Sequence, residues 1–305
     1  MRTSEAKVRV ISNPSSGGGT YDFDQLRDKL DGLEPDWVET GGKEDAVEAA
    51  REWQSGLLIV AGGDGTINDV VNGLGRAGFP EHVTLALLPS GTGNDFAATL
   101  AIPEDPAEAV AVIRQGRVRT LDAARVRSGR AGEHFFINVA TGGLGAQISD
   151  ANGEQFKSKW GKLSYLRASL EVSRNFDVRE VALTLDGERS MIRAVNVAVG
   201  NCRYAGGGWP AAPRANPEDG LLDVVVIEDI GLKELLTLTP SALAGVDYLG
   251  QEGVFSTRAR EIQVEADPGL VFTVDGEVIG DDPAEFTVLP RALKVIVGPE
   301  YVPEP

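Results

Sequence analysis

The amino-terminal third of the chain repeats one arrangement, in which an apolar strand runs into a loop of Gly, Ser, Thr and Asn and then into a helical segment. Strands are predicted at residues 8–12, 37–40, 57–61 and 83–88, and helices at 22–33, 44–53 and 68–74. Because helices separate consecutive apolar strands, the pattern predicts a parallel sheet covered on both faces. Ligands of such sheets bind at the carboxyl ends of the strands, which is where the polar loops lie.

After a helical segment within residues 103–116, the pattern changes to short strands separated by turns. The predicted strands are 118–126, 134–140, 181–185, 192–199, 222–227, 261–265, 270–274, 286–289 and 293–297, with helices at 162–173 and 232–249. Such runs of strands are typical of an antiparallel β-sandwich. We therefore expect an α/β domain over residues 1–121 and a β-sandwich domain over 122–294, with residues from about 295 to 305 packing back on the first domain.

Charge and composition exclude several classes of function. Against 29 Lys and Arg stand 46 Asp and Glu, a net charge of −17, which argues against a nucleic-acid binder. The single Cys202 and the isolated His82 and His134 argue against a thiol or zinc enzyme. No run of ~18 apolar residues and no apolar signal region is present, so we predict a cytoplasmic protein.

The second loop, Gly62-Gly63-Asp64-Gly65-Thr66, carries the strongest local signal. Glycine lets the backbone approach an anion closely, and the free amides at a helix start point toward it. A carboxylate beside phosphates needs a magnesium ion or a proton, so Asp64 is either a metal-side residue or a base. The alternative is a plain turn with Asp64 capping the helix, which we disfavour because a cap needs only one glycine.

Two further loops repeat this theme. The first, residues 13–19, lacks the Gly-Lys-Ser/Thr of a Walker loop, and alone it is equally a connection or a nucleotide loop. The third, residues 89–97, again offers a hydroxyl, glycines and a side-chain amide. Three such loops at neighbouring strand ends predict a phosphate and ribose site.

Asn13-Pro14-Ser15-Ser16-Gly17, the run from Gly62 to Asp69 and the run from Pro89 to Ala97 resemble the three nucleotide motifs of the diacylglycerol kinase catalytic-domain family. That family includes bacterial diacylglycerol kinases and YegS-like lipid kinases. Asp122, residues 136–143, residues 218–223 and Asp275-Gly276-Glu277 follow in the family's order, so the resemblance covers nearly the whole chain. It implies a NAD kinase-like nucleotide domain with a parallel sheet, then an antiparallel β-sandwich, with ATP bound in the cleft between them.

The resemblance also implies residue roles and an activity, the transfer of the ATP γ-phosphoryl group to a lipid hydroxyl, most simply that of diacylglycerol. ATP contacts are implied at Asn13, Pro14, Ser15, Ser16, Gly17, Thr40, Gly63, Asp64, Gly65, Thr66, Ile67, Asn68, Asp69 and Thr92. Thr40 matches by position and residue type only. The catalytic residues are Glu277, Asp64 and Asp122; Glu277 is the favoured base, Asp64 lies nearer the phosphate and metal, and Asp122 helps to organise a catalytic Mg²⁺ through water.

A structural Mg²⁺ is implied on Asp219 and the carbonyls of Asn216 and Leu221. An exposed turn capped by Asp219 is the alternative. Hard oxygen ligands of this kind suit magnesium or calcium.

Local sequence alone assigns both Asp186-Gly187-Glu188 and Asp275-Gly276-Glu277 to hairpin turns. Only the later triplet precedes the run 286–293 that resembles the family's ending, so Glu277 is the match and the earlier triplet is a plain turn. A basic group, Lys157, Lys159, Lys162 and Arg167, is interpreted as the solvated face of a packed helix in preference to a lipid-facing one.

Two rival functions are kept: a soluble NAD kinase, and a non-catalytic nucleotide-binding relative. The loop Gly91-Thr92-Gly93-Asn94-Asp95 has the lipid-kinase form, and the cleft acids Asp64, Asp122 and Glu277 are all present. The partner that the resemblance implies is a lipid presented at a membrane surface, which the protein would contact peripherally and transiently. No nucleic-acid partner is expected. A homodimer is left open.

Overall fold

The computed structural model describes residues 7–15, 23–30, 32–129, 132–143, 178–229, 248–281 and 283–304 of the 305. The chain divides into two compact units: unit 1, Met1–Leu121 with Arg291–Val302, and unit 2, Asp122–Pro290 with Pro303–Pro305. The predicted helix at 162–173, its basic group and all but the last two residues of the predicted helix at 232–249 lie outside the described residues.

Unit 1 is built on a parallel sheet, as the sequence predicted. Its strand order is β15–β4–β3–β1–β2, with bounds β1 (Val8–Ser12), β2 (Asp36–Glu39), β3 (Ser55–Gly62), β4 (His82–Pro89) and β15 (Ala284–Ile296). β3 and β4 stay in register from Ser55 opposite His82 to Gly62 opposite Pro89. Their carboxyl ends are therefore level, which brings the second and third loops to the same edge.

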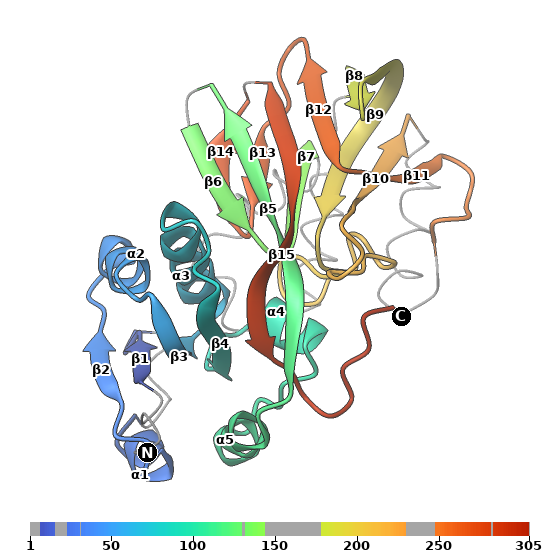
Figure 1. The fold of residues 1–305 in the computed structure, drawn as a ribbon. Coiled ribbons are helices and arrows are strands. Elements are labelled where there is room, and N and C mark those ends of the chain that lie inside the picture. Colours follow the sequence, from blue (N-terminus) through green and yellow to red (C-terminus); the bar gives the residue numbers. More distant parts are fainter. Residues whose placement is uncertain are drawn as a thin grey trace. The chain divides into compact units, whose positions relative to one another are not determined.

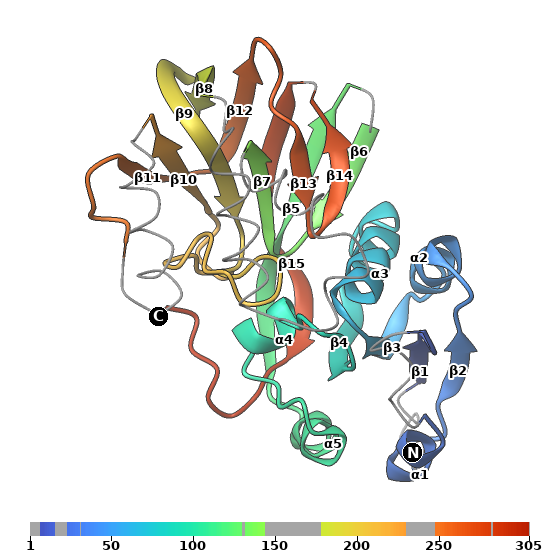
Figure 2. The ribbon, with the colours of Figure 1, turned by 180° about the vertical axis from the view of Figure 1, so that it is seen from behind.

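Helices cover both faces of this sheet. They are α1 (Phe23–Lys29), α2 (Lys43–Arg51), α3 (Asp64–Arg76), α4 (Asp95–Thr99) and α5 (Pro106–Gln115). Figures 1 and 2 show α2 and α3 on one side of the strands and α1 and α5 on the other. Within the part of the chain that the structure describes, no helix is long and apolar enough to cross a membrane.

Two helix predictions were inexact, and one helix was missed. α3 begins at Asp64 and not at residue 68. The extended Gly63 leads directly into the helix, and the acidic Asp64 in the first turn interacts favourably with the helix dipole. α1 ends at Lys29 and not at 33, since Gly32 and Glu34 take left-handed backbone angles. The short α4 was not predicted; it follows Asn94, whose φ of 54° turns the chain into it.

Unit 2 is antiparallel and sandwich-like, which also confirms the sequence prediction (Figure 2). Its strands are most of β5 (Val118–Ser128), β6 (Gly132–Phe136), β7 (Val139–Gly143), β8 (Arg179–Leu185), β9 (Glu188–Gly200), β10 (Leu222–Glu228), β11 (Val254–Ala259), β12 (Glu261–Ala266), β13 (Phe272–Val274), β14 (Glu277–Gly280) and most of β15. They pair in the order β14–β13–β7–β9–β8–β12–β15; β10 also joins β9 to β11, and β5 joins β15 to β6.

The core of unit 2 centres on three buried phenylalanines. The rings of Phe136 and Phe286 meet edge to face at 6.2 Å, and those of Phe272 and Phe286 lie 5.3 Å apart. Each ring comes from a different strand, so they tie β6, β13 and β15 together.

Two strand predictions in unit 2 were wrong. The predicted strand 134–140 is two strands, β6 and β7, because the amides of Ile137, Asn138 and Val139 turn to the Asp275 carboxylate. The predicted strands 286–289 and 293–297 are one, β15, which pairs with β12 up to Thr287 and with β4 from Lys294. Pro290 lies between these two ladders, where its missing N–H removes no bond from either.

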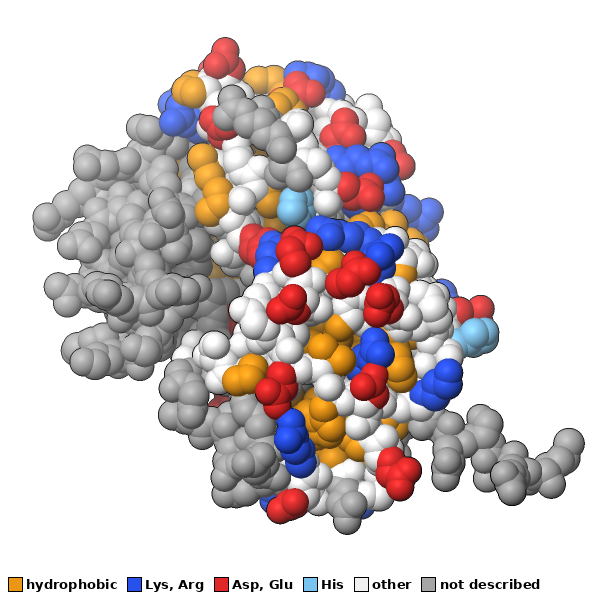
Figure 3. Space-filling view, turned by 90° about the vertical axis from the view of Figure 1, so that its left-hand side faces the viewer, with side chains coloured by type: hydrophobic (Ala, Val, Ile, Leu, Met, Phe, Trp, Pro, Cys, Tyr) orange, Lys and Arg blue, Asp and Glu red, His pale blue; other side chains and the backbone are white. Residues whose placement is uncertain are grey.

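Charged side chains of opposite sign are interspersed on the face drawn in Figure 3. Among the described residues as a whole, ion pairs include Arg9 with Asp36 at 2.6 Å and Arg189 with Glu265 at 3.0 Å. Among the described residues drawn on this face, basic side chains thus alternate with acidic ones.

Candidate functional site

The second and third loops of unit 1 pack backbone against backbone. The Ser90 amide donates to the Gly62 carbonyl at 3.0 Å, and a Cβ on Gly91 would lie 2.6 Å from the Gly63 Cα. The Asn94 side chain closes the third loop, since its amide nitrogen donates to the Gly91 carbonyl at 2.9 Å and its oxygen accepts from the Gly91 amide at 3.0 Å. Position 91 therefore admits only glycine while the loops keep this contact.

Asp64 lies at the junction of these loops. Its Oδ1 accepts from the Phe96 amide at 3.5 Å, so it contacts the start of α4 and not the amides of its own helix. Burial raises the pKa of Asp64 to about 6, the Asp95 charge adds to this rise, and the amides of residues 94–96 oppose it. The Asp64 carboxyl is thus a titratable group that changes charge just below neutral pH.

The first loop reaches α3 through one side chain. Asn13 Nδ2 donates to Thr66 Oγ1 at 3.3 Å, and Asn13 Oδ1 accepts from the Ser15 amide at 2.9 Å. Thr40 is also held at this edge, since its amide and hydroxyl both donate to the Ser12 carbonyl, at 2.9 and 3.2 Å. The predicted contacts Ser16 and Gly17 lie outside the described residues.

The predicted ATP residues differ in what they offer a ligand. Pro14, Ser15, Gly65 and Thr92 are exposed. Ile67 donates its amide to the Gly63 carbonyl at 3.0 Å and buries its side chain. The buried Asn68 bonds Asn72 through its side chain, and Asp69 is half-buried.

The predicted residues that remain, Gly63, Asp64 and Thr66, surround the first turn of the thirteen-residue α3. The first intrahelical amide is that of Ile67, so the amides of Asp64, Gly65 and Thr66 precede it. Amides of a helix start beside a glycine loop are suited to a phosphate. Unit 1 thus offers the chemistry of an anion site at the carboxyl edge of its sheet.

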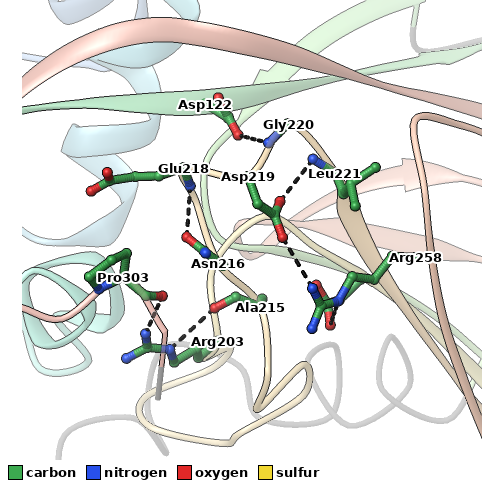
Figure 4. Close-up of polar contacts among 11 residues, drawn as sticks. Asp122, Arg203, Ala215, Asn216, Glu218, Asp219, Gly220, Leu221, Arg258 and Pro303 are labelled. Atoms are coloured by element: carbon green, nitrogen blue, oxygen red, sulfur yellow. Dashed lines mark hydrogen bonds and ion pairs between the residues drawn. The ribbon is translucent and has the colours of Figure 1, made fainter.

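A second group of polar side chains lies in unit 2, in the loop before β10 (Figure 4). Asp219 Oδ1 accepts from the Leu221 amide at 2.9 Å, and Asn216 Oδ1 accepts from the Glu218 amide at 3.0 Å. Asp122, which is 1% exposed, accepts from the Gly220 amide at 2.7 Å. Both acids therefore hold the loop through its own backbone.

Arg258 supplies positive charge to two carboxylates in this region. Its guanidinium lies 3.3 Å from Asp219 Oδ2 and 3.7 Å from Asp223 Oδ1. The other oxygen of Asp223 is buried without a hydrogen-bond partner, and burial raises the pKa of Asp223 to about 6 while Arg258 opposes the rise. The carboxylate oxygens of Asp219 and Asp223 are hard ligands of the kind that a divalent cation prefers, although the Arg258 guanidinium would compete with such a cation for them.

Among the described residues no three side chains of His, Cys, Asp or Glu come together as an ion site. A cation beside Asp219 would therefore need backbone carbonyls, of which Asn216 and Leu221 are the predicted ones. The Asn216 carbonyl is only weakly engaged, by the Asp219 amide at 3.4 Å. The residues present thus fit the predicted magnesium.

Glu277 is the first residue of β14 and is half-buried. Asp275 and Gly276 form the tight turn before it, with φ angles of 45° and 89°. The Asp275 carboxylate accepts from three consecutive amides, of Ile137, Asn138 and Val139, at 3.1 to 3.2 Å. The turn that carries Glu277 is thus fixed to the start of β7.

One buried side chain connects Asp122 to this turn. Asn201 Nδ2 donates to the Asp122 carbonyl at 3.2 Å and to the Ile137 carbonyl at 2.9 Å. Sequence reasoning missed Asn201, Arg258 and the bonds of Asp275, because each acts on a segment distant in the chain. An Asp in a tight turn commonly bonds backbone amides close by in the chain, so its position gives no sign of these distant partners.

Comparison with known proteins decides the family. Residues 7–126 match the family described as "Diacylglycerol kinase catalytic domain", and residues 138–297 match "YegS C-terminal NAD kinase beta sandwich-like domain". The chain belongs to the diacylglycerol kinase catalytic-domain family. The resemblance drawn from the loop sequences is thereby confirmed.

Relatives of this diacylglycerol kinase family member match over most of its length. The chain is 31% identical to the diacylglycerol kinase of Bacillus subtilis over 302 residues, covering 96% of this chain and 97% of the relative. It is 33% identical over 240 residues to the protein named "Probable lipid kinase YegS-like" of Pseudomonas putida, covering 77% and 75%. A crystal structure of a diacylglycerol kinase from Bacillus anthracis superposes with a TM-score of 0.75 at 25% identity, over 99% of this chain and 100% of that one.

Proposed function

We propose that this member of the family transfers the γ-phosphoryl group of ATP to the hydroxyl of a membrane lipid, with diacylglycerol as the first candidate. The observation that carries the proposal is the interlocked second and third loops of unit 1, which set Asp64 and the amides at the start of α3 at one sheet edge. The relatives named as diacylglycerol kinases support the choice of lipid.

Unit 1 would bind the nucleotide. ATP supplies the phosphoryl group, and the Mg²⁺ that accompanies it neutralises the polyphosphate. The amides of Asp64, Gly65 and Thr66 would donate to phosphate oxygens, and Thr92 would add its exposed hydroxyl. Asn13, which already bonds Thr66, would close the site from the first loop.

Unit 2 would supply the base. We assign this role to Glu277, which accepts the proton of the lipid hydroxyl; a carboxylate of ordinary basicity suffices when the proton leaves late in a loose transition state. Asp64 is the other candidate, but its place beside the helix-start amides favours a role near phosphate and metal. Glu277→Gln should nearly abolish turnover and leave ATP binding measurable by calorimetry, whereas retained turnover would remove Glu277 from this role.

Asp219, with the carbonyls of Asn216 and Leu221, would hold a structural magnesium. Asp122 would have two roles. Its carboxylate would fix the loop by accepting from the Gly220 amide, and its negative charge would help to organise a catalytic Mg²⁺. The unsatisfied oxygen of Asp223 supports a cation in this region.

The acceptor is tested directly with purified protein and γ-labelled ATP. Dispersed diacylglycerol, a sphingoid base and NAD are offered separately, each at the same protein concentration. We expect label in the diacylglycerol sample above the other two. Label appearing chiefly in NAD would establish a nucleotide kinase instead, and bound ATP without transfer to any acceptor would establish a nucleotide sensor.

A further inference from the structure

The carboxylate of Asp275 has an unusual set of partners for a turn residue. Its Oδ2 accepts from the Ile137 amide at 3.1 Å, and its Oδ1 accepts from the Asn138 and Val139 amides at 3.1 and 3.2 Å. The Asp275 amide in turn donates to the Val139 carbonyl at 3.3 Å. Bonds to an ionised acceptor are roughly twice as strong as neutral ones, so this carboxylate joins the turn firmly to the start of β7.

The turn held in this way determines where Glu277 lies. Val274 pairs with Glu277 across the turn and with Ala140 on the other side, so β13 lies between β14 and β7. β14 is the edge strand of the pairing order, and of the strands described it pairs only with β13. The backbone of Glu277 is therefore fixed by β13 and by the turn itself, and the turn is fixed by Asp275.

We propose that Asp275 is a positioning residue for Glu277, which anchors the β13–β14 turn so that the Glu277 carboxylate is held where it can accept a proton. This inference rests on the proposed lipid kinase activity. A displacement of about 1 Å in a catalytic group can cost on the order of 10²-fold in rate, so loss of the anchor should appear in turnover.

The chain contains a matched control. Asp186, in the turn between β8 and β9, has a φ of 48°, is followed by Gly187 and then by a glutamate, and accepts from the Arg260 and Glu261 amides at 3.0 and 2.9 Å. Its turn repeats the backbone geometry of the Asp275 turn and has no assigned catalytic role, but only one of its two carboxylate oxygens accepts from amides. Asparagine keeps one acceptor oxygen, so any effect of Asp186→Asn measures the structural cost of removing the charge from such an anchor.

The experiment compares wild type, Asp275→Asn, Asp186→Asn and Glu277→Gln. In Asp275→Asn an oxygen acceptor becomes an NH₂ group, which cannot accept from an amide. We expect kcat for lipid phosphorylation to fall about 10- to 100-fold in Asp275→Asn with KM for ATP within about twofold. In Asp186→Asn both constants should stay within about twofold, although both variants should unfold at lower urea than wild type.

A second pair of variants covers the case in which Asp275→Asn does not fold. Gly276 and Gly187 both have a φ of 89° and have nothing within 4 Å of an added Cβ, so alanine strains each turn equally without a clash. Gly276→Ala should lower kcat and Gly187→Ala should not. The inference is overturned if the members of either pair have equal kcat, and an inactive wild type overturns the proposed function together with it.

Discussion

Replacing Asp64 by asparagine should stabilise unit 1 at neutral pH. A pKa raised from 3.8 to about 6 means that folding favours the protonated carboxyl, so the stabilisation is complete below pH 3.8 and is lost as the pH rises to 6. The full difference corresponds to about 3 kcal/mol, an upper limit because Asp64 is only half-buried. Asparagine keeps an oxygen that can accept from the Phe96 amide and carries no charge.

The assay is urea-dependent hydrogen exchange of peptides from β3 and β4, which reports on unit 1 alone. The free energy of unfolding should be about 1–3 kcal/mol higher in Asp64→Asn than in wild type at pH 7.5. At pH 3.5, where the wild-type carboxyl is protonated in the folded state and mostly protonated in the unfolded state, most of this difference should disappear. Other titrating groups are common to both proteins and cancel in the comparison.

Asp64→Asn should bind ATP with lower affinity and turn it over more slowly. A carboxylate that is retained although it lowers the stability of the fold is typical of a functional site. A difference in the free energy of unfolding between wild type and Asp64→Asn that does not change with pH would refute the claim that burial raises the pKa of Asp64. So would a variant that is less stable at pH 7.5.

Three further predictions follow from other contacts. Gly91→Ala places a Cβ 2.6 Å from the Gly63 Cα, so the second and third loops must separate. The affinity for ATP, measured by calorimetry, should then fall tenfold or more, and an unchanged affinity would mean that the nucleotide binds elsewhere. Arg258→Gln removes a positive charge beside Asp219 that would repel a cation, so the affinity for Mg²⁺ or a luminescent Tb³⁺ probe should rise several-fold. A fall in this affinity would contradict a magnesium site at Asp219. Asn201→Ala removes the side-chain donor of the Asp122 and Ile137 carbonyls, so the free energy of unfolding of unit 2, measured with urea, should fall by about 1–3 kcal/mol. An unchanged urea midpoint would contradict this.

Local patterns predicted the architecture of both units. The alternation of apolar strands and helices predicted the parallel sheet, and the loops between them predicted the sheet edge that gathers Asn13, Asp64 and Thr66. These features depend on residues close in sequence, where side-chain type and backbone preference act together. The hairpin at Asp186 was predicted for the same reason, and the structure confirms it.

Contacts between distant segments could not be predicted in this way. The break at Ile137 and Asn138 exists because the Asp275 carboxylate, 138 residues after Ile137, takes amides that a strand would otherwise use. The sharing of Arg258 between Asp219 and Asp223 likewise depends on how β10 and β11 pair. Apolar periodicity carries no information about such pairings, because it reports which face is buried and not what lies opposite.

The claim on which the rest of the account depends is that the strand-end loops of unit 1 bind the triphosphate of ATP. Hydrogen exchange with and without saturating Mg²⁺ and ATP tests it most directly, with AMP as the control that lacks the β- and γ-phosphates. The account predicts slower exchange in peptides covering residues 62–69 and 89–96, with little protection by AMP. Protection by ATP confined to other segments, with these two unchanged, would contradict it.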